Sequence, residues 1–156
     1  MKRHLTLLVA AVAVAAPAFV ILNSAPAGAS VHFSFTQHLT NFEAVINGQH
    51  STTPTTLPGP GDTFIFRSDL RQNGVVVGFS NDVCTETFNL NAMCNTVFAF
   101  TNKGDLMATA LTRGPDPSVY DDAITGGTFA YRNAHGDAHA VVSGGNVNWT
   151  VNFVTQ

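Results

Sequence analysis

Three side chains that could bind a metal or move protons alternate near the end of the chain: His135, Asp137 and His139. Alternate residues of an extended strand point to the same face, so these three would lie in one row. At about 3.3 Å per residue, His135 and His139 lie about 13 Å apart, too far for both to bind one ion on a straight strand. A zinc ion needs its ligands around one centre. We therefore expect no metal site and no cofactor.

The chain has two cysteines, Cys84 and Cys94. In an exported protein two cysteines are expected to pair, because the compartment is oxidising; the alternative is two independent buried thiols. A bridge between neighbouring strands would set Gly78 opposite Phe100, and a large ring opposite a strand glycine is a favourable pairing. The tip of the loop would fall near Asn89, in turn-like sequence. The sequence therefore predicts a disulfide-bridged β-hairpin.

The first residues have the anatomy of a secretory signal. Two basic residues precede an apolar stretch from Leu5 to Leu22, and a small-x-small pattern, Ala27-Gly28-Ala29, follows. This pattern predicts a signal peptide over residues 1–29, cleaved between Ala29 and Ser30, and a secreted, extracellular protein with no stable membrane insertion after processing. The alternative is a retained membrane anchor, because the apolar run approaches the length of a bilayer span.

Residues 30–156 are enough for one domain with one core. Without Lys2 and Arg3 the chain has a net charge of −5, so nucleic acid is not expected as a partner. Charged residues make up 11% of the whole chain, well below the usual quarter. A small domain with so few charges is expected to cover part of its surface by forming a homo-oligomer.

Period-two alternation and turn residues dominate residues 30–156, and no helix is predicted. Tight turns are expected at Asn73-Gly74 and Gly144-Gly145, and irregular loops over 47–60 and 114–122. We divide the domain into a first strand with its loop (30–60) and a barrel body (61–156). The predicted strands are 31–36, 42–46, 63–70, 75–85, 95–101, 106–112, 128–132, 138–143 and 147–154.

Both faces of the bridged hairpin carry apolar side chains. Val75, Phe79 and Val83 would line one face, and Phe98 and Phe100 the other. A sheet with one face in water would show a polar stripe instead. These patterns predict an all-β fold of roughly eight or nine strands. They favour a closed antiparallel β-barrel, whose outer face packs against another subunit, over an isolated sandwich.

The segment 123–138, which reads AITGGTFAYRNAHGDA, resembles the C-terminal signature of dirigent proteins. It is also similar to the bacterial allene oxide cyclase barrel-like proteins, and the resemblance extends over about 58–153. Two positions depart from the signature, because Phe129 stands where glycine is usual and His135 where arginine is. The glycines Gly126-Gly127 and Gly136 would allow backbone angles or close approaches at barrel corners and bends.

The resemblance implies a closed eight-stranded antiparallel β-barrel of the calycin type. Such a barrel would bind a small hydrophobic molecule in its lumen, as an isomerase (cyclase) or a stereo-directing protein. Pocket Asp and Arg side chains serve the plant dirigents, and only Asp69 and Arg132 match here, as candidate catalytic residues. The resemblance also implies a homo-oligomer, with a trimer as the candidate oligomeric state. The alternatives are a non-catalytic, lipocalin-like carrier and a structural protein of the cell envelope, so the state of the lumen discriminates among them.

Overall fold

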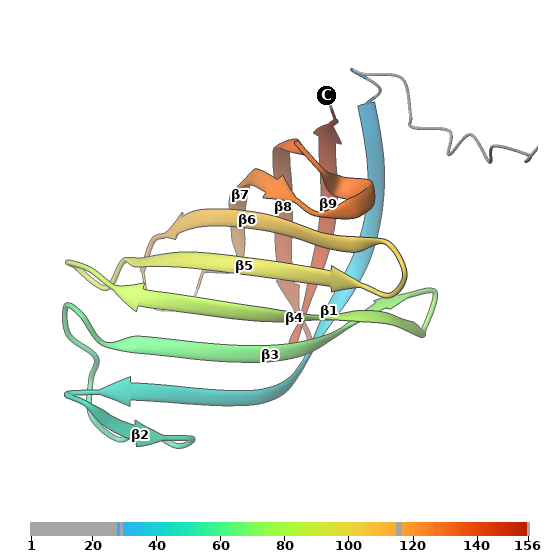
Figure 1. Cartoon of the computed structure of the whole chain (residues 1–156). Helices are drawn as coiled ribbons and strands as arrows, with labels where there is room; N and C mark the ends of the chain where they lie inside the picture. Colours follow the sequence, from blue (N-terminus) through green and yellow to red (C-terminus); the bar gives the residue numbers. More distant parts are fainter. Residues whose placement is uncertain (1–27, 29, 115–116, 156) are drawn as a thin grey trace, which may run out of the picture.

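One long strand closes the sheet into a barrel. The computed structural model describes residues 28, 30–114 and 117–155, so the predicted signal peptide and its cleavage site after Ala29 lie outside the described residues. In the sheet order β2-β1-β3-β4-β5-β6-β7-β8-β9, β1 also pairs with β9, and every pairing is antiparallel. Eight strands therefore form a closed barrel, with β2 attached outside the ring (Figure 1). The elements are β1 (Ser30–Ile46), β2 (Gln49–Ser51), β3 (Thr63–Gln72), β4 (Val75–Glu86), β5 (Ala92–Phe100), β6 (Gly104–Thr112), β7 (Val119–Gly127), the short 3₁₀ helix η1 (Phe129–Tyr131), β8 (His135–Ser143) and β9 (Asn146–Val154).

β1 serves two neighbours in turn. Its first half pairs with β9 from Ser30 opposite Val154 onward, and its second half pairs with β3. Residues 36–38 pair with both neighbours, and a register shift in the β1–β3 ladder follows between Leu39 and Asn41. The two strands predicted over 31–36 and 42–46 are therefore one bent strand, because a bulge lets a strand turn a barrel corner without ending.

The bridged hairpin is confirmed. A disulfide joins Cys84 to Cys94, which lie opposite each other in the β4–β5 ladder. The same ladder sets Gly78 opposite Phe100. A β-carbon added at Gly78 would lie 2.1 Å from the carbonyl oxygen of Ala99, so only glycine fits there.

Three sequence predictions about local structure are wrong. The strand predicted over 128–132 is η1, because Phe129 adopts a left-handed φ of 48° that ends the extended run and lets Tyr131 turn into the core. The loop predicted over 114–122 contains the start of β7, which pairs with β8 from Val119 opposite Val141 onward. The loop predicted over 47–60 likewise contains the short strand β2.

Aromatic rings fill the middle of the barrel. Phe35, Phe98 and Trp149 are almost fully buried, and the Phe98 and Trp149 ring centroids lie 5.0 Å apart in an edge-to-face arrangement. Such edge-to-face pairs stabilise a core beyond the area that they bury. The filled middle separates the two ends of the lumen. In the described part of the chain, no helix is long and apolar enough to cross a membrane.

Candidate functional site

A cavity of about 570 Å³ lies at one end of the barrel. Its mouth is formed by connections between strands, at Pro58, Leu90, Pro117 and Gly145. Most of its wall is apolar, but polar and acidic side chains line its deeper part: Gln37, Ser68, Asp82, Glu86, Thr96, Tyr120 and Asp122. A mostly apolar cavity with a few convergent polar groups is the usual form of a small-molecule site.

The loop over this mouth is anchored by Asp62. Its carboxylate accepts hydrogen bonds from the backbone N–H of Asn47 at 2.8 Å and of Gly59 at 2.7 Å. These two backbone N–H groups lower the pKa of Asp62, the Asn47 group most. The anchored loop brings Leu57 and Pro58 to the cavity.

A buried hydrogen-bond chain forms the floor. Trp149 Nε1 donates to Gln37 Oε1 at 2.7 Å, and Gln37 Nε2 donates to Asp82 Oδ2 at 2.7 Å and to Ser80 Oγ at 2.9 Å. Ser80 Oγ also donates to Asp82 Oδ2 at 3.3 Å. Buried polar groups that are satisfied in this way hold one arrangement, so the chain fixes the orientation of the Asp82 carboxyl group.

Burial raises the pKa of Asp82 to about 6. Removal from water disfavours the charged form, while hydrogen bonds from Thr96, Ser80 and Gln37 act in the opposite direction and favour it. Asp82 therefore titrates close to neutral pH.

The pKa of Asp122 is raised further than that of Asp82. The Asp122 side chain is on β7, the residue is 3% exposed, and its Oδ1 is buried without a hydrogen-bond partner among the described residues. Burial raises the pKa of Asp122 to about 7, and the negative charges of Asp82 and Asp121 add to the shift. The cavity thus holds two carboxyl groups that exchange protons near neutral pH, as a general acid or base requires.

Tyr120 supplies a neutral hydroxyl to the same cavity. Burial raises its pKa further above the ordinary phenol value, and the charges of Asp122 and Asp82 also raise it. Its ring packs edge-to-face on Trp149 with centroids 5.5 Å apart. A phenol that keeps its proton can donate a hydrogen bond to a ligand oxygen or nitrogen.

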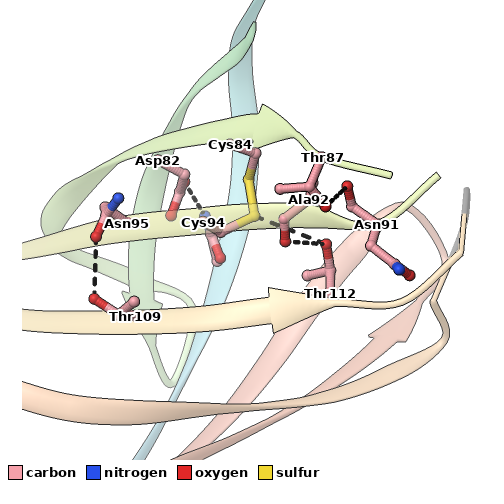
Figure 2. The surroundings of a disulfide bond; sticks show 10 residues. Asp82, Cys84, Thr87, Asn91, Ala92, Cys94, Asn95, Thr109 and Thr112 are labelled. Carbon is pink, nitrogen blue, oxygen red and sulfur yellow. Dashed lines mark hydrogen bonds between the residues drawn. A yellow bond between two sulfur atoms is a disulfide. The ribbon is translucent and has the colours of Figure 1, made fainter. Parts of the chain in front are cut away.

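The disulfide is part of the cavity wall. Both Cys84 and Cys94 line it, beside Asp82 on the adjacent stretch of β4 (Figure 2). Thr112 Oγ1 donates to the Ala92 carbonyl oxygen at 3.1 Å and lies 3.9 Å from Cys94 Sγ. The bridge ties β4 to β5 where the acidic groups are presented.

The structure places Asp69 and Arg132 away from this cavity. Asp69 is on β3 between the inward-facing Ser68 and Leu70, so it points outward, where Arg71 Nη2 lies 3.4 Å from its Oδ2. Arg132 is an exposed residue at the C-terminal end of η1. The two are not brought together, and neither lines the cavity at either end of the barrel. Their catalytic roles stay a prediction, and the geometry favours Asp82 and Asp122.

The sequence contained a signal for these two carboxyls. Asp82 falls in a predicted strand at the same parity as the inward-facing Ser80 and Cys84, so a charged residue interrupts the inner face. The sequence contained no such signal for Asp122, because residues 114–122 were predicted as a loop although β7 begins at Val119. His135, Asp137 and His139 lie on the outer face, where His139 Nδ1 lies 2.7 Å from Asp121 Oδ1. Across the described residues, no group of three or more His, Cys, Asp or Glu side chains could hold a metal ion.

A second cavity, also of about 570 Å³, occupies the opposite end of the barrel. Phe33, Phe100, Tyr131 and Phe153 line it, and Lys103 is at its rim. Its described lining includes no carboxyl group. The two ends therefore differ in charge, with acids at one end and a lysine at the other.

The architecture is that of a closed β-barrel of the allene oxide cyclase/dirigent fold. A structure of pyocyanin demethylase matches with a TM-score of 0.66 at 23% identity, covering 80% of this chain and 100% of that one. The pterocarpan synthase dirigent protein GePTS1 matches with a TM-score of 0.62 at 20% identity over 83% of this chain and 93% of its own. PsPTS1, another such dirigent protein, matches with a TM-score of 0.57 at 17% identity over 82% and 97%.

These likenesses confirm the fold that the sequence resemblance implied. No protein-family model matches the chain, and no curated protein matches its sequence. The similarity is therefore one of architecture, and the chemistry must be argued from the cavity itself.

Proposed function

We propose that the protein binds a small, largely apolar molecule in the acidic cavity, and that Asp122 exchanges a proton with it during an isomerisation, a cyclisation or a stereo-directed coupling. The observation that carries the proposal is the carboxyl group of Asp122, which is buried, has an oxygen without a described partner, and has a pKa of about 7. An acid with a pKa near the ambient pH can both give and take a proton efficiently.

The remaining cavity groups have supporting roles. Gln37 holds Asp82 in place, so Asp82 can share the proton or stabilise a positive charge that develops on the ligand. Tyr120 offers a hydroxyl donor, and the apolar wall holds the molecule in one folded shape. Holding a reactive molecule in one orientation accounts for much of the rate of such reactions.

Two alternatives are less well supported. A lipocalin-like carrier needs no ionisable group in its cavity, and burying two unneeded carboxyl groups would lower its stability. A structural protein would fill its lumen with its own side chains, whereas both ends of this barrel are open. The similar structures include a demethylase and two pterocarpan synthase dirigent proteins, which supports a chemical role for a barrel of this fold.

Secretion and self-association are part of the same proposal. The Cys84–Cys94 disulfide supports export to an oxidising compartment. On the outer face of β4, β5 and β6, exposed apolar side chains gather at Phe79, Val83, Met93, Met107 and Leu111. A patch of this kind supports a homo-oligomer in which barrels pack through this face.

Native mass spectrometry of the secreted protein identifies the molecule that co-purifies, and turnover of that molecule is then measured. We expect Asp122→Asn to reduce the turnover rate by about 100-fold or more, a typical effect of losing a general acid or base. Asp69→Asn, on the outer face, is the matched control and should leave turnover unchanged. The opposite pattern would refute the role of the cavity acids and support the assignment made from the family resemblance.

A further inference from the structure

All the ionisable side chains of basic or carboxylic type in the described lining of the acidic cavity are carboxylic acids. Asp82, Glu86 and Asp122 line it, and its described lining contains no lysine, arginine or histidine. A ligand that enters therefore meets carboxyl groups without any cation to balance them. In a low-dielectric cavity such unbalanced charges act strongly on the charge of a ligand.

Two of these acids, Asp82 and Asp122, differ in how their carboxyl oxygens are hydrogen-bonded. Asp82 Oδ2 accepts hydrogen bonds from Gln37 and Ser80, so that oxygen is already partnered. Asp122 Oδ1 has no partner among the described residues although the residue is 3% exposed. A buried acceptor left unsatisfied costs free energy that a donor on a ligand would recover.

The groups packed around Asp122 add no positive charge. Its neighbour Asp121 points to the outer face, where it pairs with His139. Opposite it on β8 lies Ala138, and Asp82 on β4 acts on it as a further negative charge. Tyr120, two residues earlier on β7 and in the same cavity lining, keeps its proton. Because no Lys, Arg or His is among the described residues that line the cavity, a positive group facing Asp122 there would come from the ligand.

We infer that the acidic cavity selects a hydrophobic cation, an apolar ring system that carries a protonated amine or a cationic ring nitrogen, with that nitrogen seated against Asp122. This inference rests on the proposed function, because it names the class of molecule for the same cavity. An apolar anion is excluded by the three carboxyl groups, and a neutral molecule leaves Asp122 Oδ1 unpartnered unless it carries a donor of its own.

Three probes of the same shape test this inference: 1-naphthylmethylamine, 1-naphthalenemethanol and 1-naphthoate, as cation, neutral molecule and anion. Binding is measured by isothermal titration calorimetry at pH 8 and pH 5. Backbone amide shifts in NMR spectra, near Tyr120 or near Tyr131, report which end of the barrel each probe occupies. At pH 8 we expect the amine to bind at the Tyr120 end about tenfold or more tightly than the alcohol, as for a hydrogen bond to a charged group.

Protonation of Asp82 and Asp122 should remove most of this preference. A pH of 5 is below the pKa values of Asp82 and Asp122, about 6 and about 7, so both carboxyl groups are mostly protonated and neutral. We therefore expect the amine and the alcohol to bind within about threefold of each other at this pH. Near pH 6 the amine should displace a proton into the buffer, which calorimetry detects in buffers with different ionisation enthalpies. The alcohol should release none.

Asp122→Asn should abolish the preference for the amine at pH 8 and leave binding of the alcohol intact, while Asp69→Asn should behave as the unmodified protein. Circular dichroism melting of both variants verifies that they fold. If Asp122→Asn does not fold, proton release by the unmodified protein still decides. Equal binding of amine and alcohol at pH 8, a preference for the naphthoate, or a preference that survives in Asp122→Asn overturns the inference but leaves the proposed function standing. Failure of all three probes to bind at the Tyr120 end overturns both.

Discussion

Trp149 donates its indole N–H to Oε1 of Gln37 across 2.7 Å, and the two residues come from β9 and β1, the strands that close the barrel. The same side chain also contacts the cavity acid, because Nε2 of Gln37 donates a hydrogen bond to Asp82. One amide side chain therefore links the two closing strands to the orientation of a cavity acid.

Replacing Gln37 with methionine, which has a similar shape, should therefore lower stability and raise the pKa of Asp82. The substitution leaves the Trp149 N–H without an acceptor and removes a donor that favours the charged form of Asp82. We expect a loss of about 1–3 kcal/mol in the free energy of unfolding, the usual cost of an unsatisfied buried group. Urea denaturation measures the first effect, and an NMR titration of the Asp82 carboxyl carbon measures the second. An unchanged Asp82 pKa would contradict the coupling.

The buried acids should make the protein less stable at high pH. Both have folded-state pKa values above the ordinary carboxyl value of 3.8, so the folded chain holds more protons than the unfolded chain between about pH 4 and pH 7. Stability contributed by these groups is therefore lost as the pH rises through this window. Asp122→Asn should flatten this slope and raise the unfolding free energy at pH 8 by about 1–3 kcal/mol. Thermal melts of both proteins from pH 4.5 to pH 8 provide the comparison, and parallel curves would show that Asp122 is not so perturbed.

Removing the disulfide should cost stability without changing the fold. The bridge closes a short loop with a sequence separation of 10, for which the chain-entropy argument gives about 3 kcal/mol. The double variant Cys84→Ala/Cys94→Ala should unfold at lower urea concentration and keep its β-sheet circular dichroism spectrum. A midpoint equal to that of the oxidised protein would show that the hairpin needs no bridge.

The glycines of the 123–138 segment should differ sharply in how well they tolerate replacement by alanine. A β-carbon at Gly136 would lie 2.1 Å from the Asn152 carbonyl oxygen, whereas one at Gly126 would meet nothing within 4 Å. Gly136→Ala should destabilise the barrel by about 3 kcal/mol or more, because backbone must move to admit it. Gly126→Ala is the matched control and should change stability by less than about 1 kcal/mol. Melting temperatures of the two variants decide the matter.

Charge placed on the outer face of β4 and β6 should dissociate the proposed oligomer. Val83 and Met107 are exposed apolar residues there, and a lysine at either position would have to be buried unpaired in an interface. Sedimentation of Val83→Lys and Met107→Lys should give monomers that still fold. His32→Lys, on the exposed face of β1, is the control. A protein that is monomeric without any substitution would refute self-association at the concentration used.

Sequence periodicity was sufficient for the barrel and the bridged hairpin, because alternation and turn chemistry are local. Asn73-Gly74 and Gly144-Gly145 adopt the left-handed angles that two-residue hairpin turns require. The site could not be located in this way. Whether a strand residue faces the lumen depends on bulges and on how the barrel closes. Ser68 faces inward and the next residue, Asp69, faces outward, so an error of one residue in the predicted alternation reverses the assignment.

The two-sided pairing of β1 also has a kinetic consequence. Ser30 lies opposite Val154, so the ring is sealed by residues from the two extremes of the described chain. Contacts between such remote segments form slowly, since the intervening chain must be ordered first. The nascent protein therefore cannot complete its ring, its tryptophan anchor or its acid pocket until the last strand has been synthesised. A species that lacks this strand would expose the edges of β1 and β8 to other chains, which makes the final segment the safeguard against aggregation.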